Sequence, residues 1–257
     1  MKPKMIFGTC LPRSGGSLAS NLLSCHKNIL VTTDLFHFFR FAINKYSPIT
    51  KYSNQFRLIH EICLRLKIRN KILFNADKIL NENRINSYKD ILFAFARSIK
   101  KNNKNKNFIG EVANNEWRNI EIFLKMDKEF KAFQIIRDPR AILASWKKLT
   151  YSKGFKYLNV IFQWADAMNY CDRNYKKYPK RFLKIKFEDI HLNPKKIAEK
   201  FSKFIGVKMD KNMINEKKWP KLLKNKLIKV NFSSYSKKKT FGFSYSRTET
   251  WKKNIKP

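Results

Sequence analysis

Acidic residues are scarce in this sequence of 257 amino acids. It contains 19 aspartates and glutamates but 56 lysines and arginines, which gives a formal net charge of +37 at pH 7. Nucleic acid is the first partner that such a charge suggests. The basic residues, however, are spread along the whole chain among many asparagines and isoleucines. A coding bias toward Lys, Asn and Ile would also produce this pattern, so a polyanion or acidic surface and background composition both stay open as explanations.

Cysteines and long apolar runs are also few. No stretch approaches the roughly 20 apolar residues that a membrane span needs, and the apolar run after Lys4 is too short for a signal peptide. The cysteines form no C-x-x-C pair, which argues against a zinc site or a disulfide framework. They are Cys10, Cys25, Cys63 and Cys171. We therefore expect a soluble cytoplasmic protein, or one attached at most to a surface.

The chain does contain strand patterns that alternate with helix patterns. Apolar or β-branched runs predict strands at 5–7, 28–33, 108–112, 132–136 and 183–187, the last closing with Glu188-Asp189. Helical spacing of apolar residues predicts helices at about 18–23, 54–69, 88–100, 117–124, 141–149, 157–177, 194–204 and 245–255. This order favours an α/β fold with a parallel central sheet and helices on both faces. No repeat or linker divides it, which predicts a single domain over 1–257.

The turn between the first strand and the first helix has the composition of an anion site. The first turn of a helix offers N–H groups without intrahelical partners and partial positive charge, both of which suit a phosphate or sulfate. Two glycines let the backbone curl closely, two serines add hydroxyl donors, and an arginine adds a permanently charged fork of donors. These residues are Arg13, Ser14, Gly15, Gly16 and Ser17.

This turn lacks the lysine of the nucleotide-triphosphate loop G-x-x-x-x-G-K-[ST], since Gly16 stands before Ser17. No acidic strand end for magnesium is obvious either. A nucleotide kinase with a divergent loop is therefore disfavoured, while a bare turn with a helix start remains an alternative to an anion site.

A second basic turn follows the strand at 132–136. Arg137 begins it, and Asp138 with Pro139 suits the cap and first turn of the next helix, on which Ser145 lies. Because ligands of parallel sheets collect at the carboxyl ends of the strands, Arg13 and Arg137 are both placed to meet one ligand with two anionic groups. A plain capped turn is the simpler interpretation of this segment by itself.

In combination, these segments resemble the sulfotransferases that use 3′-phosphoadenosine 5′-phosphosulfate (PAPS). The first is similar to the 5′-phosphosulfate loop of that family, and it reads Pro12-Arg13-Ser14-Gly15-Gly16-Ser17-Leu18. The second, 136–146, is similar to the 3′-phosphate segment, in which Arg and Ser stand eight apart as Arg137 and Ser145 do. The segment 186–190 is similar to the strand end that follows in many members of the family. The resemblance spans residues 4 to about 205 and implies a P-loop-like sulfotransferase fold.

The resemblance also implies roles for individual residues. Arg13 to Leu18 would hold the phosphosulfate, Arg13 would stabilise the charge of the leaving group, and Arg137 with Ser145 would hold the 3′-phosphate. PAPS would be the co-substrate, with no metal. The acceptor hydroxyl also needs a base, and Asp34 is the first candidate, ahead of His37 and Glu111. In the less certain tail, 207–257, the basic residues Arg247 and Lys252 could contact the nucleotide, while Trp251 reads more simply as the anchor of a surface helix.

The sequence therefore predicts an enzyme that moves a sulfuryl group from PAPS to a hydroxyl, with a carbohydrate as the expected acceptor. The helical region 35–100 would wall the acceptor site, and His26, His60 and His191 are expected to be structural. The rival hypothesis is a basic nucleic-acid-binding protein in which the loop has only a structural role. Steep salt dependence of nucleic-acid binding would distinguish that rival.

Overall fold

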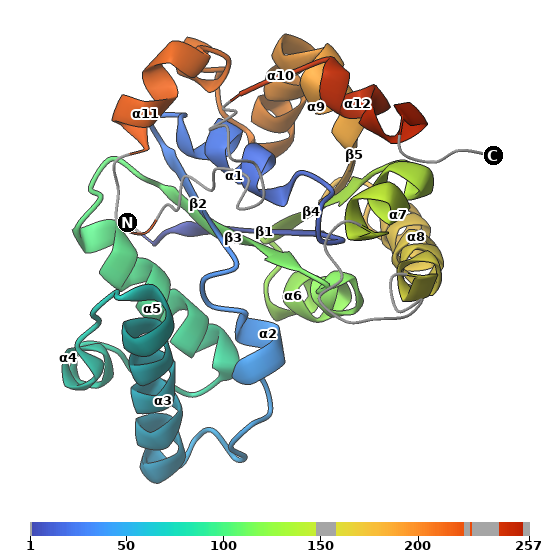
Figure 1. The fold of residues 1–257 in the computed structure, drawn as a ribbon. Helices are drawn as coiled ribbons and strands as arrows, with labels where there is room; N and C mark the ends of the chain where they lie inside the picture. The colour runs from blue at the N-terminus through green and yellow to red at the C-terminus, as the bar shows by residue number, and fades with distance from the viewer. Residues whose placement is uncertain (1, 148–157, 224–226, 228–241, 254–257) are drawn as a thin grey trace.

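A parallel β-sheet of five strands forms the centre of the computed structural model, which describes residues 2–147, 158–223, 227 and 242–253 (Figure 1). The strands lie in the order β2-β3-β1-β4-β5. Their bounds are β1 Lys4–Cys10, β2 Ile29–Thr33, β3 Phe108–Asn114, β4 Lys131–Ile136 and β5 Phe182–Lys186. All neighbouring pairs are parallel. The fold predicted from the alternation of strands and helices is confirmed.

Strand β1 lies at the middle of the sheet because its sequence suits burial on both faces. Every residue of β1 after Lys4 is buried, as expected for a parallel strand covered by helices on both sides. Its neighbours are β3, with Ile6 opposite Gly110, and β4, with Gly8 opposite Phe133. The carboxyl ends of β1, β3 and β4 therefore meet at one edge, where the predicted anion turns begin.

Helices cover both faces of this sheet. On one face of β4, the rings of Phe133 and Phe201 of α10 have their centroids 5.1 Å apart. On the other face, the next residue, Gln134, donates a hydrogen bond to the carbonyl oxygen of Ala167 in α8. Figure 1 shows α1 and α10 together on one side and α6 on the other. The helices of these layers are α1 Gly16–Ser24, α6 Ile120–Met126, α7 Pro139–Lys147, α8 Asn159–Lys177, α9 Phe187–Leu192 and α10 Pro194–Ile205.

The segment between β2 and β3 forms a separate group of helices beside the sheet (Figure 1). They are α2 Phe38–Phe41, α3 Tyr52–Asn70, α4 Ala76–Asn81 and α5 Tyr88–Lys101. The predictions for α3 and α5 are confirmed, and Ser87 caps α5 by accepting a hydrogen bond from Asp90 N. The short helices α2 and α4 were not predicted, because four to six residues are too few to establish a helical period.

Two predicted boundaries are wrong. The strand expected at 183–187 ends at Lys186. Glu188 and Asp189 lie in the first turn of α9, where carboxylates interact favourably with the helix dipole. The helix expected at 245–255 is a short α12, Ser246–Glu249, followed by a 3-10 turn, η5 Thr250–Lys253. The remaining parts of the predictions at 141–149, 157–177 and 245–255 that fall on 148–157 and 254–257 lie outside the described residues. No helix in the described ranges has both the length and the apolar character to cross a membrane.

Gly110 is the position in the sheet that tolerates a side chain least. A Cβ atom there would collide with the backbone carbonyl oxygen of Ile6 in the paired strand β1. We predict that Gly110→Ala lowers the free energy of unfolding by about 3 kcal/mol or more. Urea unfolding followed by circular dichroism measures this loss.

Gly206 provides the matched control. It ends α10 with φ +88°, but a Cβ atom added to it would meet no other atom within 4 Å. Gly206→Ala should therefore cost only about 1 kcal/mol, which comes from its backbone conformation. Equal losses in the two variants would contradict the close approach of β1 and β3.

Candidate active site

The loop after β1 is shaped by left-handed backbone conformations and close packing. Arg13 has φ 75° and Gly15 has φ 90°, a region that glycine enters without steric cost. A Cβ atom on Gly15 would collide with the Phe187 ring, and one on Gly16 would stand 2.8 Å from Cys10 Sγ. The loop therefore needs both glycines to lie this close to β1 and α9.

The loop and the first turn of α1 bring a buried hydroxyl next to backbone N–H groups. Gly15 is the N-cap of α1 and has no side chain with which to cap the helix, and Ser17 and Leu18 lie in its first turn. The Ser14 hydroxyl is buried and has no hydrogen-bond partner among the residues that the structure describes. The N–H groups at the start of a helix, beside a buried hydroxyl, form a cradle for an anion.

The two predicted anion segments contact each other directly. Arg13 Nε donates to Ser145 Oγ at 3.1 Å, and Arg137 Nη1 donates to the carbonyl oxygen of Arg13. Trp146 of the same helix donates from Nε1 to the carbonyl oxygen of Pro12 at 3.3 Å. Ser145, which was expected to act with Arg137, is thus paired with Arg13. The structure brings the loop and the 137–146 segment into one site.

Arg137 is a half-buried cation at this junction. Its guanidinium lies 4.1 Å from the Phe187 ring centroid, and Nη2 donates to the carbonyl oxygen of Arg247 at 3.2 Å. Burial, together with the charges of Arg13 and Arg247, lowers the pKa of Arg137 to about 10, while Glu188 and Asp138 act in the opposite direction. Its Nε has no partner within the described residues. A desolvated guanidinium with an unused donor atom favours an anionic ligand.

The first candidate base, Asp34, lies next to the loop at the end of β2. Its carboxylate accepts hydrogen bonds from the backbone N (2.9 Å) and the side-chain amide of Asn114, the last residue of β3, at the same edge of the sheet. Asn114 Oδ1 in turn accepts from Cys10 Sγ at 3.1 Å and stands 4.0 Å from the position of a Cβ on Gly16. Asn114 therefore links the Asp34 carboxylate to the start of α1.

The second candidate, His37, pairs with the first. His37 Nε2 lies 3.3 Å from Asp34 Oδ1, and Nδ1 lies 3.8 Å from Glu116 Oε1. Glu116 is buried and also pairs with Arg40 Nε at 3.1 Å. Sequence reasoning missed Asn114, Glu116 and Arg40. The strand prediction stopped at residue 112, two residues before the true end of β3, so Asn114 and Glu116 were not considered, and Arg40 lies on the short helix α2, which was not predicted.

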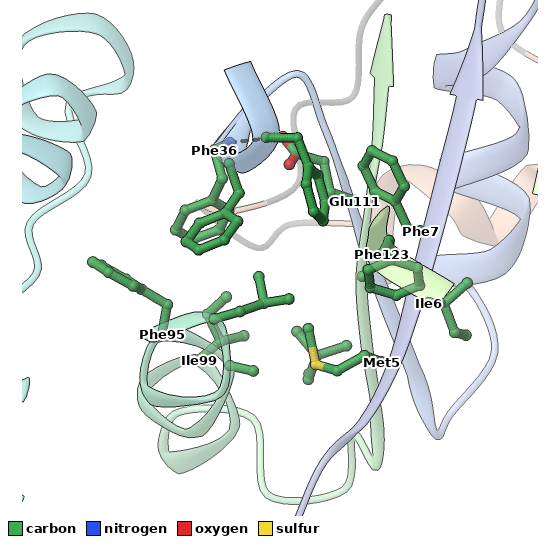
Figure 2. A pocket seen from close by; sticks show the side chains of 14 residues that line it. Met5, Ile6, Phe7, Phe36, Phe95, Ile99, Glu111 and Phe123 are labelled. Carbon is green, nitrogen blue, oxygen red and sulfur yellow. Dashed lines mark hydrogen bonds between the residues drawn. The ribbon is translucent and has the colours of Figure 1, made fainter. Parts of the chain in front are cut away.

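Glu111, the third candidate, faces the turn that carries His37. Its carboxylate accepts hydrogen bonds from the backbone N of Phe36 at 2.6 Å and of His37 at 3.1 Å, as Figure 2 shows for Phe36. Burial raises the pKa of Glu111, against the effect of His37 and these N–H donors. It also lines an otherwise apolar cavity of about 40 Å³ between the sheet and α5 (Figure 2). These contacts fit a residue that holds the turn in place.

The described part of the tail reaches the same site. The carbonyl oxygen of Arg247 accepts from Arg137, and Trp251 lies under the guanidinium of Arg140 at 4.1 Å. Lys252 forms an exposed ion pair with Glu249 at 2.6 Å. The tail thus contacts the 137–146 segment through a backbone oxygen and an aromatic ring. Whether Arg247 or Lys252 meets the nucleotide stays a prediction.

His191 connects this tail to α9, and its environment predicts acid sensitivity. Its Nδ1 accepts a hydrogen bond from Ser244 N at 3.0 Å, and burial, then the charges of Arg247 and Arg137, lower its pKa from 6.5 to about 4. The pKa of His191 is lower in the folded protein than in the unfolded chain. The contribution of neutral His191 to the free energy of unfolding is therefore complete above pH 6.5 and is lost as the pH falls toward 4. We expect a loss of about 2 to 3 kcal/mol in the free energy of unfolding by pH 4.5.

Urea unfolding at pH 7 and pH 4.5 measures this loss. The control is His191→Asn, whose side-chain oxygen can still accept a hydrogen bond but does not titrate. The difference between the two pH values should be about 2 to 3 kcal/mol smaller in the variant. Equal acid losses in both proteins would show that the pKa of His191 is not depressed.

Comparison with known proteins agrees with this architecture. The sequence model of the sulfotransferase family matches residues 3–211. Two solved structures share the fold: the sulfotransferase domain of the Synechococcus PCC 7002 olefin synthase, at 14% identity and TM-score 0.60, covering 100% of this chain and 90% of that one, and the sulfotransferase domain of the curacin biosynthetic pathway, at 14% identity and TM-score 0.62, covering 99% and 92%. No curated protein matches the chain.

The family match includes both anion segments and all three candidate bases, on a sheet with the topology described above. The chain belongs to the sulfotransferase family.

Proposed function

We propose that this sulfotransferase takes its sulfuryl group from PAPS, transfers it to a hydroxyl, and releases adenosine 3′,5′-bisphosphate. The observation that carries the proposal is the joining of Arg13, Ser145 and Arg137 in one partly buried junction. Two polar atoms at this junction, Ser14 Oγ and Arg137 Nε, lack partners in the described chain. Anionic groups at the two ends of one nucleotide would satisfy both.

The residues present fit such a co-substrate. Ser14, Ser17 and the first N–H groups of α1 would hold the phosphosulfate, and Arg137 with Ser145 would hold the 3′-phosphate. PAPS, when bound, supplies an activated sulfuryl group on a phosphate leaving group. Arg13 then stabilises the negative charge that grows on that leaving group, because its guanidinium is already held in place by Ser145.

The Asp34–His37 pair is placed to take the proton of the acceptor hydroxyl. Asn114 holds the Asp34 carboxylate through two hydrogen bonds, which leaves further lone pairs of the carboxylate for a hydroxyl. His37 Nε2 is 3.3 Å from Asp34 Oδ1, so it can orient the carboxylate and share the proton. Asp34 remains the first candidate for the base, with His37 as its partner.

Nucleotide binding tests the proposal most simply. Calorimetry should give saturable binding of adenosine 3′,5′-bisphosphate to the native protein. Arg13→Ala and Arg137→Ala should each weaken it about tenfold or more, since each removes a charged hydrogen-bonding group. The matched control is Arg118→Ala, which removes an exposed arginine paired with Asp166 of α8. The proposal fails if the native protein does not bind, or if both site variants bind as well as the control.

Measurements of turnover by variants of Asp34 and Glu111 distinguish between the candidate bases. With labelled PAPS and an acceptor found by screening, Asp34→Asn should lower kcat about 100-fold or more, because it removes the base. Bisphosphate binding should change little. Glu111→Gln should affect the free energy of unfolding more than kcat, since Glu111 holds backbone N–H groups.

Asp172→Asn is the control for this series, because Asp172 lies on α8 in an exposed pair with Lys184. Full activity of Asp34→Asn together with an inactive Glu111→Gln would assign the base to Glu111 instead. The same screen tests the expected carbohydrate acceptor, which neither the family nor the fold specifies and which stays a prediction.

A further inference from the structure

A cleft of about 290 Å³ lies between α2 and α3. This volume is at the lower end of the range of about 300–1,000 Å³ that small-molecule sites occupy. Of its ten lining residues, seven are apolar and three are charged. It therefore has room for a single ring or a short chain, in surroundings that are mostly hydrocarbon.

The cleft adjoins the candidate base. Phe36 and Phe38, which line it, are the chain neighbours of His37. The ring of a third lining residue, Phe41, meets the His37 ring edge-on with centroids 6.0 Å apart. On its other side His37 contacts Asp34, and Asp34 leads through Asn114 to the loop. The Asp34–His37 pair is thus linked to the loop through Asn114 and to the wall of this cleft through Phe41.

The rim of the cleft is apolar and open to solvent. Phe41 is 41% exposed, Leu64 is 55% exposed and Ile68 is 64% exposed, and all three line the cleft. Sugar rings need several directed polar partners, whereas these walls offer mostly carbon. An apolar ligand body would remove this surface from water, which is favourable in proportion to the area covered.

The charges of the cleft leave a net positive balance. Lys45 and Glu61 form an ion pair at 2.8 Å and offset each other. Arg65 has no such partner: its Nη1 donates to the carbonyl oxygen of Phe36 at 2.6 Å, its guanidinium lies 4.0 Å from the centroid of the Phe41 ring, and its Nη2 has no hydrogen-bond partner in the described part of the chain.

Neighbouring cations add to this imbalance. Burial lowers the pKa of Arg65, and the charges of Arg69 and Arg40 lower it further, while Glu111 acts in the opposite direction. An anionic group on the ligand would relieve the repulsion among these arginines.

We propose that this cleft is the acceptor site and that the acceptor is a small hydroxylated anion with an apolar aryl or short alkyl body. The inference rests on the proposed function and specifies its second substrate, in place of the carbohydrate that the sequence analysis expected. The apolar body lies against the phenylalanines, the anionic group pairs with Arg65, and the hydroxyl reaches the Asp34–His37 pair.

Ligand binding in the presence of saturating adenosine 3′,5′-bisphosphate tests this proposal. The probes are 4-hydroxyphenylacetate for an aryl body and 3-hydroxyoctanoate for an alkyl body, each compared with its neutral amide, and N-acetylglucosamine as a sugar. Calorimetry or ligand-observed NMR should show at least one of the two anions binding about tenfold more tightly than its amide and more tightly than the sugar. Which anion binds separates the aryl source from the alkyl source.

Two variants localise the binding. Arg65→Gln should weaken the anionic probe about tenfold and leave the amide nearly unchanged. Leu64→Asp adds a negative charge at an exposed rim position, where folding should be unaffected, and should also weaken the anionic probe. The control is Arg57→Gln, on an exposed residue of α3 outside the cleft, which should bind as the native protein does.

The outcomes separate this inference from the proposed function. Preferential binding of the sugar, no binding of either anion, or unchanged binding in both cleft variants overturns the acceptor proposal, even when the bisphosphate binds normally. Failure of the bisphosphate to bind overturns the proposed function, and the probes alone then show whether the cleft takes an apolar anion.

Discussion

The partly buried junction between Arg13, Ser145 and Arg137 is the interaction on which the site depends. Arg13 begins the cradle after β1, and Arg137 follows the neighbouring strand β4. Hydrogen bonds from Arg13 Nε to Ser145 Oγ and from Arg137 to the Arg13 backbone join the two turns. Concentrating two guanidinium groups in a largely buried place is costly without negative charge nearby. The junction therefore explains why the proposed nucleotide, with its anionic groups, would bind at this place.

Much of this could be predicted from the sequence, because the decisive features are local. A buried strand, two glycines and an arginine before a helix define the loop within a dozen residues, and Asp138 does accept a hydrogen bond from Arg140 N at the start of α7. The alternation of strands and helices likewise determined the sheet class. Since parallel strands end at one edge, the meeting of Arg13 with Arg137 followed from the order of these elements.

What the sequence could not provide is pairing between distant side chains. The contact of Ser145 with Arg13, rather than with Arg137, depends on how α7 leans against the loop, and no periodicity records that. Asn114 and Glu116 acquire meaning only when β2 and β3 are neighbours, so their contacts with Asp34 and His37 were invisible. The cleft between α2 and α3 depends on a four-residue helix whose pattern is too short to detect.

The central claim is that the site binds a nucleotide at both its 3′ and 5′ ends. The most direct measurement compares the affinities of adenosine 3′,5′-bisphosphate, adenosine 5′-monophosphate and adenosine 3′-monophosphate by calorimetry at fixed ionic strength. We predict saturable binding of the bisphosphate about tenfold or more tighter than that of either monophosphate. Equal affinities for the three nucleotides, or binding only to polynucleotides with a steep salt dependence, would contradict the claim.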